Sequence, residues 1–429
     1  MSISPPEDLA DQDRSAALTT GANPVPLRRL LLSVLPATAA MYALYQGVQQ
    51  ILIPLQVQHI DPDRKVANLA ILTAVVAVTS LIAIPIGGAI SDRTRGRFGR
   101  RTPWLVGASL LSLGLLAIMG NLQAMLPLTV VYGALWFTAN FYQGAWVGIL
   151  PDRVPVARRG VASSVIGFAT PLGILIGVNY AAQVPQNIAY LTLGLFLFGT
   201  TLILVFGAPE GPFEGHPPVK KERRSPLQLV GEFFSGFAHA NFRYAFISRF
   251  LLYLSYFVVN GYLLYTLQDR IGVENLPGNS AAVGIGILTT INSVTWIAVA
   301  SFCGWLADKF DRRKLFVGIC AVGMGAGMLV PVFYPTWTGM IIYAVLVGGF
   351  KGAYVAIDLA LMSLVLPNHL SAGRDMGLLS IATGTPQLIS GAIAGLLITF
   401  AGGYTTLFIF GAFVSLLAGI TILPIRGIR

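Results

Sequence analysis

The sequence predicts an all-α membrane protein, in which helices that cross the bilayer make up most of the chain. Of its 429 residues, 55% are hydrophobic and only 11% are charged, whereas about a quarter of the residues in a soluble protein are charged. Twelve apolar runs each approach the ~20 residues that a membrane-spanning helix requires. The runs lack the polar alternation that marks the strands of a membrane β-barrel.

The apolar runs fall into two groups of six, separated by one long polar segment. The expected spans are 30–53, 67–90, 103–121, 127–150, 161–183, 188–207, 244–267, 282–305, 315–334, 338–364, 376–400 and 404–424. We therefore expect an N-terminal bundle at 30–207 and a C-terminal bundle at 244–424, two pseudo-symmetric six-helix bundles in all.

The polar segments outside these bundles predict cytoplasmic tails and a linker. Residues 1–29 are polar and rich in proline, and no apolar core with a cleavage site follows a basic stretch, so we expect a disordered tail rather than a signal peptide. Residues 208–243 carry a basic run and predict a cytoplasmic linker between the bundles. Residues 425–429 form a short C-terminal tail.

The distribution of the basic residues is explained by the expected membrane topology and does not indicate a nucleic-acid-binding surface. Most of the 28 Lys and Arg residues lie in connections on one side, whereas Arg64, Lys65 and Arg270 fall on the other and Lys351 falls within a span. Basic residues concentrate in cytoplasmic loops, and this bias sets the orientation of a membrane protein. We expect a multi-pass plasma-membrane protein with both termini in the cytoplasm, the lipid bilayer as its surroundings and no nucleic-acid partner.

One loop carries five arginines between two spans, and a reduced copy occurs in the second half. The first reads GAISDRTRGRFGRRTPW from Gly88, and the second reads GWLADKFDRRKL from Gly304. Gly88 and Asp92 are separated from Gly304 and Asp308 by the same number of positions. That offset also relates Leu150-Pro151 to Leu366-Pro367, which indicates an internal duplication.

Both loops resemble the signature loop between the second and third helices of each half in the major facilitator superfamily. The first is similar to the longer form in glycoside/hexuronide:cation symporters and sucrose-type transporters. The resemblance implies a twelve-helix transporter whose two halves rock around a central cavity, with the loops acting as cytoplasmic gates. The implied gating residues are Asp92, Arg93, Arg100, Arg101, Asp308, Lys309, Arg312 and Arg313.

A second constellation lies in the tenth expected span. Lys351, Tyr354 and Asp358 occupy positions i, i+3 and i+7, so they share one helix face. Asp358 is the one acid expected deep in a span, and an ionisable residue at that depth marks an ion or substrate path by default. We expect Asp358, together with Lys351, to couple transport to protons; the alternative is a buried structural pair.

Amides and aromatic side chains recur at helical spacing in the other spans. Amide groups pair with hydroxyls, and aromatic rings stack on the apolar face of a sugar. The alternative for any one residue is a hydrogen bond between helices. The candidate substrate-binding residues are Tyr42, Tyr45, Gln46, Gln49, Trp136, Asn140, Gln143, Asn179, Tyr256, Asn260, Asn292, Trp296 and Tyr354.

Several classes of function are disfavoured by what the sequence lacks. It contains no P-loop, no enzyme signature and no metal-ligand spacing among its four His residues, so we expect no enzyme, no cofactor and no metal site. Spans 67–90 and 127–150 contain no acids, whereas the sodium-coupled members of the symporter family carry acids there; this absence argues against sodium.

The sequence therefore predicts a monomeric secondary transporter of a small polar organic solute, a sugar or glycoside, with a proton as coupling ion. The alternative is proton-coupled efflux of a drug-like or secondary metabolite. A third class, a transporter-like receptor, is disfavoured by the gating loop in each half.

Overall fold

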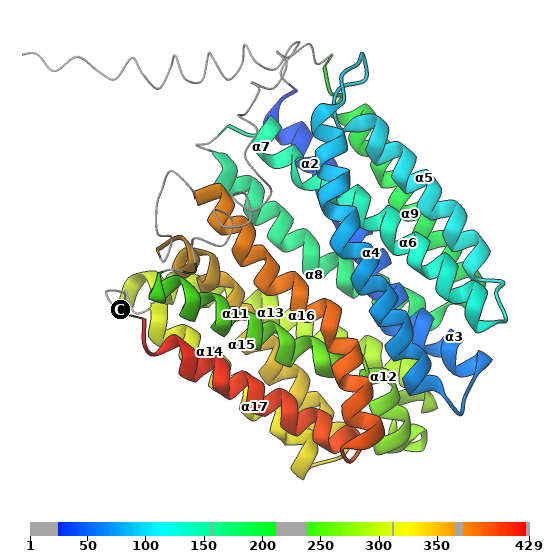
Figure 1. The fold of residues 1–429 in the computed structure, drawn as a ribbon, viewed down its shortest axis with the longest axis vertical. Coiled ribbons are helices and arrows are strands. Elements are labelled where there is room, and N and C mark those ends of the chain that lie inside the picture. Colours follow the sequence, from blue (N-terminus) through cyan, green and yellow to red (C-terminus); the bar gives the residue numbers. More distant parts are fainter. Residues whose placement is uncertain are drawn as a thin grey trace, which may run out of the picture. The chain divides into compact units, whose positions relative to one another are not determined.

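The chain folds into long helices, with no β-sheet among the residues that the structure describes (Figure 1). This computed structural model describes residues 25–155, 158–211, 237, 239–310, 313–364 and 372–425. Most of the expected tail at 1–29 and of the expected linker at 208–243 lies outside these ranges, as do residues 426–429.

The N-terminal half contributes six long helices and one short one. The first helix runs through α2 (Leu27–Gly47), the π-helical turn η1 (Val48–Leu52) and α3 (Ile53–Ile60). The others are α4 (Lys65–Arg93), α5 (Thr102–Met119), α6 (Met125–Val147), the short α7 (Ile149–Arg153), α8 (Arg159–Gln183) and α9 (Gln186–Gly207).

The C-terminal half repeats the pattern of six long helices. They are α11 (Ala240–Asn260), α13 (Ala281–Phe310), α14 (Arg313–Phe333), α15 (Trp337–Leu364), α16 (Ala372–Phe400) and α17 (Tyr404–Ile422). Between α11 and α13 lie the short turns α12 (Leu263–Thr266), η4 (Leu267–Gly272), η5 (Val273–Asn275) and η6 (Pro277–Asn279).

Each of the twelve expected spans coincides with a long helix, which confirms the predicted fold class. Eleven of the described helices are long and apolar enough to cross a membrane. The one remaining long helix, α6, has 23 residues. It carries Trp136, Asn140 and Gln143, whose polar or amphipathic side chains lower its hydropathy. The molecule is a multi-pass membrane protein.

The seventh helix is shorter than the predicted span 244–267. Helix α11 ends at Asn260, and the chain continues through a turn at Gly261 and Tyr262 into short helical segments. Glycine lowers helix stability by removing the side chain and adding backbone entropy. The Tyr262 hydroxyl, held by a hydrogen bond to the carbonyl of Gly391 at 3.1 Å, fixes the redirected chain.

The helices group into two compact units. Unit 1 contains residues 1–45, 78–173 and 185–221, and unit 2 contains residues 46–77, 174–184 and 222–429. Parts of the first, second and fifth long helices thus belong to the same unit as the C-terminal six. The predicted bundles are continuous segments of the sequence, whereas the two units are defined by which residues pack together.

Glycine allows close packing of helices in unit 1. A Cβ at Gly144 of α6 would collide with the backbone of Ile84 and Gly88 in α4, and a Cβ at Gly87 would collide with Phe141. Since helices in lipid gain little from apolarity alone, such close backbone approach supplies their packing energy. Helices α5, α6 and α9 lie side by side in the same unit (Figure 1).

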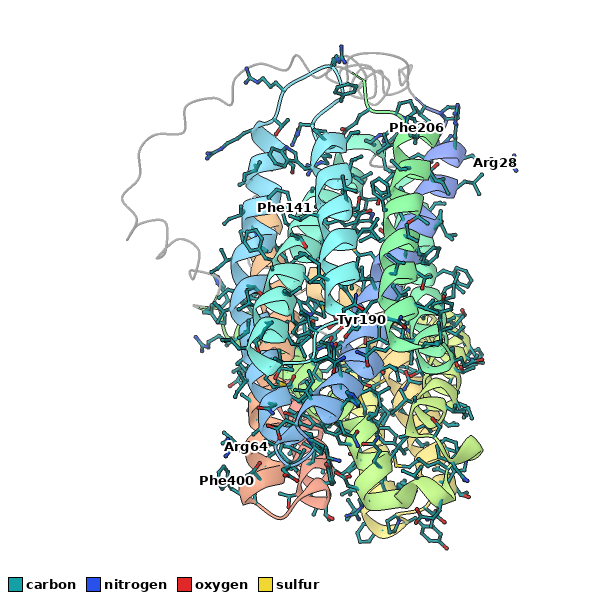
Figure 2. All side chains as sticks on the ribbon, turned by 90° about the vertical axis from the view of Figure 1, so that its right-hand side faces the viewer. Arg28, Arg64, Phe141, Tyr190, Phe206 and Phe400 are labelled. Atoms are coloured by element: carbon teal, nitrogen blue, oxygen red, sulfur yellow. The ribbon has the colours of Figure 1, made fainter. Side chains whose placement is uncertain are left out.

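Unit 2 is built around α13, α14 and α15. Helix α17 packs on α14, and α16 packs on α11. Large apolar side chains also cover the outside of the helices in both units; Phe206 and Phe400 project from them and are 74% and 81% exposed (Figure 2). Exposed apolar side chains on this scale suit contact with lipid rather than water.

Candidate functional site

The loop at 94–101, here called the arginine loop, is held by a charged network. Asp92 at the end of α4 accepts hydrogen bonds from Arg100 at 2.6 Å and Arg101 at 2.9 Å. Arg101 also donates from Nε to Asp152 of α7 at 2.6 Å and from Nη1 to Ser91 Oγ at 3.1 Å. Arg101 is only 4% exposed, so these charge-assisted bonds join α4, α5 and α7 through one buried guanidinium.

Glu210 completes this network from the segment after α9. Its Oε2 accepts hydrogen bonds from the backbone N–H groups of Arg101 and Thr102, at 2.8 and 3.0 Å, and from the Thr102 hydroxyl at 3.1 Å. A carboxylate at the first turn of a helix satisfies unpaired N–H groups and interacts favourably with the helix dipole. Gly99, with φ of +82°, gives the loop the backbone conformation that brings Glu210 close.

The predicted gating residues of the first loop divide into two groups. Asp92, Arg100 and Arg101 are brought together, whereas Arg93 is exposed and forms no ion pair with Asp92 among the described residues. Ser91, Asp152 and Glu210 are members that the sequence analysis missed. In the second loop, Arg312 and the side chains of Asp308, Lys309 and Arg313 lie outside the described residues.

A neutral cluster of aromatic and amide side chains joins α2 and α6 in unit 1. The Tyr45 ring stacks on Trp136 with centroids 5.0 Å apart and meets Tyr42 edge to face at 6.2 Å. Its hydroxyl donates to the Ala139 carbonyl at 2.8 Å and lies 3.4 Å from Gln143 Oε1. Trp136 Nε1 is buried and makes no hydrogen bond of good geometry among the described residues, although its side chain interacts with Tyr132.

Two predicted amides of the N-terminal half are already committed to the protein itself. Asn140 donates from Nδ2 to Ser80 Oγ of α4 at 2.9 Å and to the Trp136 carbonyl at 2.7 Å. Gln46 accepts a hydrogen bond from Gln50 in the following turn. Gln49 is half-buried in the π-helical turn η1.

A charged cluster lies in unit 2 where α11 and α15 meet. Asp358 of α15 is 2% exposed and forms an ion pair with Arg249 of α11, with Nη1 and Oδ2 3.1 Å apart. Arg249 Nε donates to Thr383 Oγ1 of α16 at 2.9 Å. Asp358 is therefore paired across helices, with Arg249, rather than along its own helix with Lys351.

Two tyrosines line this ion pair. The guanidinium of Arg249 lies 5.9 Å from the centroid of the Tyr253 ring, and that ring meets Tyr354 edge to face at 6.0 Å. The Tyr354 hydroxyl interacts electrostatically with Asp358, yet neither that hydroxyl nor Asp358 Oδ1 has a hydrogen-bond partner of good geometry among the described residues. One carboxylate oxygen thus remains available to a proton or a ligand.

Lys351 lies two turns before Asp358 on α15 and is 6% exposed. Its Nζ is 3.1 Å from the centroid of the Tyr256 ring and 4.7 Å from that of Trp296. Glycine makes this arrangement possible, because a Cβ at Gly348 or Gly352 would collide with the backbone of α13, the helix that carries Trp296. The close approach of α13 and α15 places the Trp296 ring beside Lys351, whereas the Tyr256 ring comes from α11.

The remaining predicted amides differ in their contacts. Asn179 of α8 donates to Thr290 Oγ1 of α13 at 2.9 Å, which is an interhelical bond. Asn292 lies 3.5 Å from the Ala344 carbonyl, and Asn260 is half-buried at the end of α11.

Unit 2 also contains contacts between residues of the two sequence halves. Lys65 at the start of α4 pairs with Asp269 of η4 at 2.7 Å, and Tyr404 donates to the other oxygen of Asp269 at 2.6 Å. The Tyr265 hydroxyl donates to the Pro54 carbonyl at 2.9 Å. These contacts join the ends of α3 and α4 that are remote from the arginine loop to the C-terminal helices.

Comparison with known proteins agrees with the fold. The model of the Major Facilitator Superfamily matches residues 35–267 and 245–427. The solved structures of a variant of the nucleoside transporter NupG and of a bacterial homolog of the human lysosomal transporter Spinster superimpose with TM-scores of 0.72 and 0.66. Their sequence identities are 13% and 14%, over 92% and 94% of this chain and 100% and 96% of theirs.

Curated relatives match parts of the chain. The chain is 27% identical to MFS transporter asaE of Aspergillus flavus over 61% of its length, and 24% identical to the lactose permease of Leuconostoc lactis over 72%. It is 29% identical to monocarboxylate transporter 12-B of Danio rerio over 34%. The matches span 56%, 52% and 29% of the lengths of these relatives.

Proposed function

The chain belongs to the major facilitator superfamily, and from that premise we propose that it carries a small polar organic solute, a sugar or glycoside, across the plasma membrane by proton-coupled alternating access. The observation that carries the proposal is the Arg249–Asp358 pair. A buried ion pair contributes little net stability compared with apolar packing, so a function in transport explains the pair better than stability does.

Asp358 is suited to the coupling step because of its geometry. One carboxylate oxygen pairs with Arg249; the other makes no hydrogen bond of good geometry among the described residues, although the Tyr354 hydroxyl interacts with the carboxylate. A proton on the second oxygen weakens the attraction to Arg249, so protonation is linked to the separation between Arg249 of α11 and Asp358 of α15. A movement of these helices that lengthens the pair favours proton binding, and the reverse movement favours release.

Each of the two clusters, taken by itself, offers groups that suit a polar solute. Tyr45 and Trp136 offer ring faces and an indole N–H in the neutral cluster, and Tyr256 and Trp296 offer rings beside Lys351. Ring faces and a few placed polar groups are what small-molecule sites use. The similarity to a lactose permease supports a sugar among polar solutes.

The arginine loop supports the alternating-access part of the proposal. Its network binds α4, α5 and α7 through Arg101, while Lys65 and Asp269 join the two sequence halves at the helix ends remote from that loop. A transporter must break contacts at one end of its helices before it opens there, and these two sets of polar contacts are reversible. We propose that the arginine loop is cytoplasmic.

Uptake into liposomes tests the proposal. Purified protein is reconstituted, and accumulation of labelled lactose, glucose and a β-glucoside is measured with and without an inside-alkaline pH step. One proton per solute and a step of one pH unit support up to about tenfold accumulation, since each factor of ten corresponds to ~1.4 kcal/mol. A protonophore should abolish it.

The same assay separates the alternatives. Sugar uptake that is equal with and without the pH step would contradict coupling and indicate facilitated diffusion. Transport of cationic or aromatic drugs but of none of the sugars would instead support efflux of a drug-like metabolite, which the ring-rich surroundings of Tyr45 and Lys351 also suit.

A further inference from the structure

Lys351 is a buried cation that lacks an anionic partner. Its side chain is 6% exposed, and among the described residues it takes part in no ion pair and no hydrogen bond. Buried lysines are almost always paired, because removing an ammonium group from water costs several kcal/mol. An unpaired Lys351 therefore requires a physical explanation.

The aromatic rings around Lys351 offset only part of this cost. Tyr256 and Trp296 present ring faces 3.1 and 4.7 Å from Nζ, and a desolvated cation–π contact contributes about 2 kcal/mol. An ammonium group has three N–H donors, whereas the two rings face it from two directions. At least one donor therefore has no acceptor among the residues that the structure describes.

Asp358 does not provide the missing charge. Its carboxylate binds Arg249 at 3.1 Å, and it lies two helical turns from Lys351, about 10 Å along the axis at 1.5 Å per residue. Arg249, Asp358 and Lys351 together carry one net positive charge. A ligand with one negative charge would balance the cluster, whereas a doubly charged phosphate would leave an excess of negative charge.

We propose that Lys351 binds the carboxylate of the transported solute, and that Tyr256 and Trp296 contact the carbon skeleton beside it. The inference rests on the proposed transport of a small polar organic solute, and it replaces the neutral sugar with an organic monoanion, such as a hydroxylated carboxylic acid. A compact ammonium group suits this ligand, because it binds an oxyanion as a point charge without demanding bidentate geometry. The ring faces favour a solute with an apolar or cyclic side next to its carboxylate.

Binding to the purified, full-length protein in detergent tests this proposal without any gradient. Three pairs of probes differ in charge: gluconate with sorbitol, 4-hydroxybenzoate with 4-hydroxybenzamide, and lactate with lactamide. We expect at least one acid to raise the unfolding temperature in a saturable way, and its neutral counterpart to bind at least tenfold more weakly. Equal binding within every pair, or binding of none of the acids, would overturn the proposal.

Variants then test whether the acid binds in the cage formed by Lys351, Tyr256 and Trp296. Lys351→Met should weaken acid binding at least tenfold, whereas Lys351→Arg should retain part of it. Lys314→Met is the matched control, since Lys314 is a half-buried lysine whose Nζ donates to the Ile425 carbonyl away from the cage. Unchanged acid binding by Lys351→Met would overturn the assignment; if that variant does not fold, Tyr256→Leu replaces it with the same expectation.

The outcome is independent of the uptake assay. Acid binding without gradient-driven uptake would leave the anion site intact and count against proton coupling alone. Uptake of neutral sugars without acid binding would support the proposed transport and contradict the anion site.

Discussion

The neutral cluster around Tyr45 and the charged cluster around Asp358 lie on helices of different sequence halves and differ in how their polar groups are satisfied. The Tyr45 hydroxyl is held by a backbone carbonyl, and no ionised group takes part. In the charged cluster, Asp358 pairs through one oxygen with Arg249, and the described residues offer Lys351 two aromatic rings and no anion. The duplicated halves have thus specialised: one offers fixed surfaces, and the other offers charges that a proton or a solute can complete.

The largest loss of stability should follow removal of one partner of the buried ion pair between Arg249 and Asp358. Arg249→Met leaves Asp358 buried without a counter-ion, and breaking such a pair costs about 3–5 kcal/mol. The unfolding temperature of the purified protein in detergent measures this loss. Arg249→Met/Asp358→Asn removes both charges and should recover most of the stability. A single variant that unfolds at the wild-type temperature would show that the pair is not formed in the membrane protein.

A smaller effect, on KM for the solute, is expected in the neutral cluster, because a substitution there leaves no buried charge without its partner. Trp136→Leu removes the ring stacked on Tyr45 and the indole N–H, so KM for the solute should rise about two- to twelvefold, as expected for an aromatic contact of about 0.5–1.5 kcal/mol. The dependence of uptake on the pH step should not change. Trp337→Leu, at the start of α15, is the control. An altered pH dependence in Trp136→Leu would remove the distinction between the clusters.

The helices were predictable because each one is an apolar run of membrane length, and α4 through α17 follow the expected order. The break after Asn260 was not predictable from the sequence, because glycine is common within membrane helices and most glycines do not end a helix. What distinguishes Gly261 is a tertiary contact, the hydrogen bond from its neighbour Tyr262 to Gly391. Sequence periodicity describes one helix and carries no information about its neighbours.

The same limit explains the result at the candidate site. The spacing of Lys351 and Asp358 predicts a shared face of α15, but the partner of Asp358 is Arg249 of α11, which was not among the predicted site residues. Its position inside the predicted span 244–267 was the signal that could have identified it. The rings beside Lys351 depend on Gly348 and Gly352, whose role appears only once α13 is packed against them.

Hydrogen bonds between helices also separate residues that look alike in the sequence. Asn140 and Asn179 have the same amide group as Gln143 and the same helical spacing to aromatic residues. In the structure, Asn140 binds Ser80 and Asn179 binds Thr290. For these two the structure supports the alternative of interhelical bonding, while Gln143 remains beside Tyr45 with its amide nitrogen uncommitted.

The most direct test of the account is to separate exchange from accumulation in Asp358→Asn. Liposomes containing the variant, with Arg249→Gln/Asp358→Asn as the charge-balanced control, are assayed for labelled-solute exchange at equal pH and for uptake driven by a pH step. The account predicts that both variants exchange solute but accumulate none above the external concentration. Wild-type accumulation by Asp358→Asn would contradict it and assign the Arg249–Asp358 pair to structure alone.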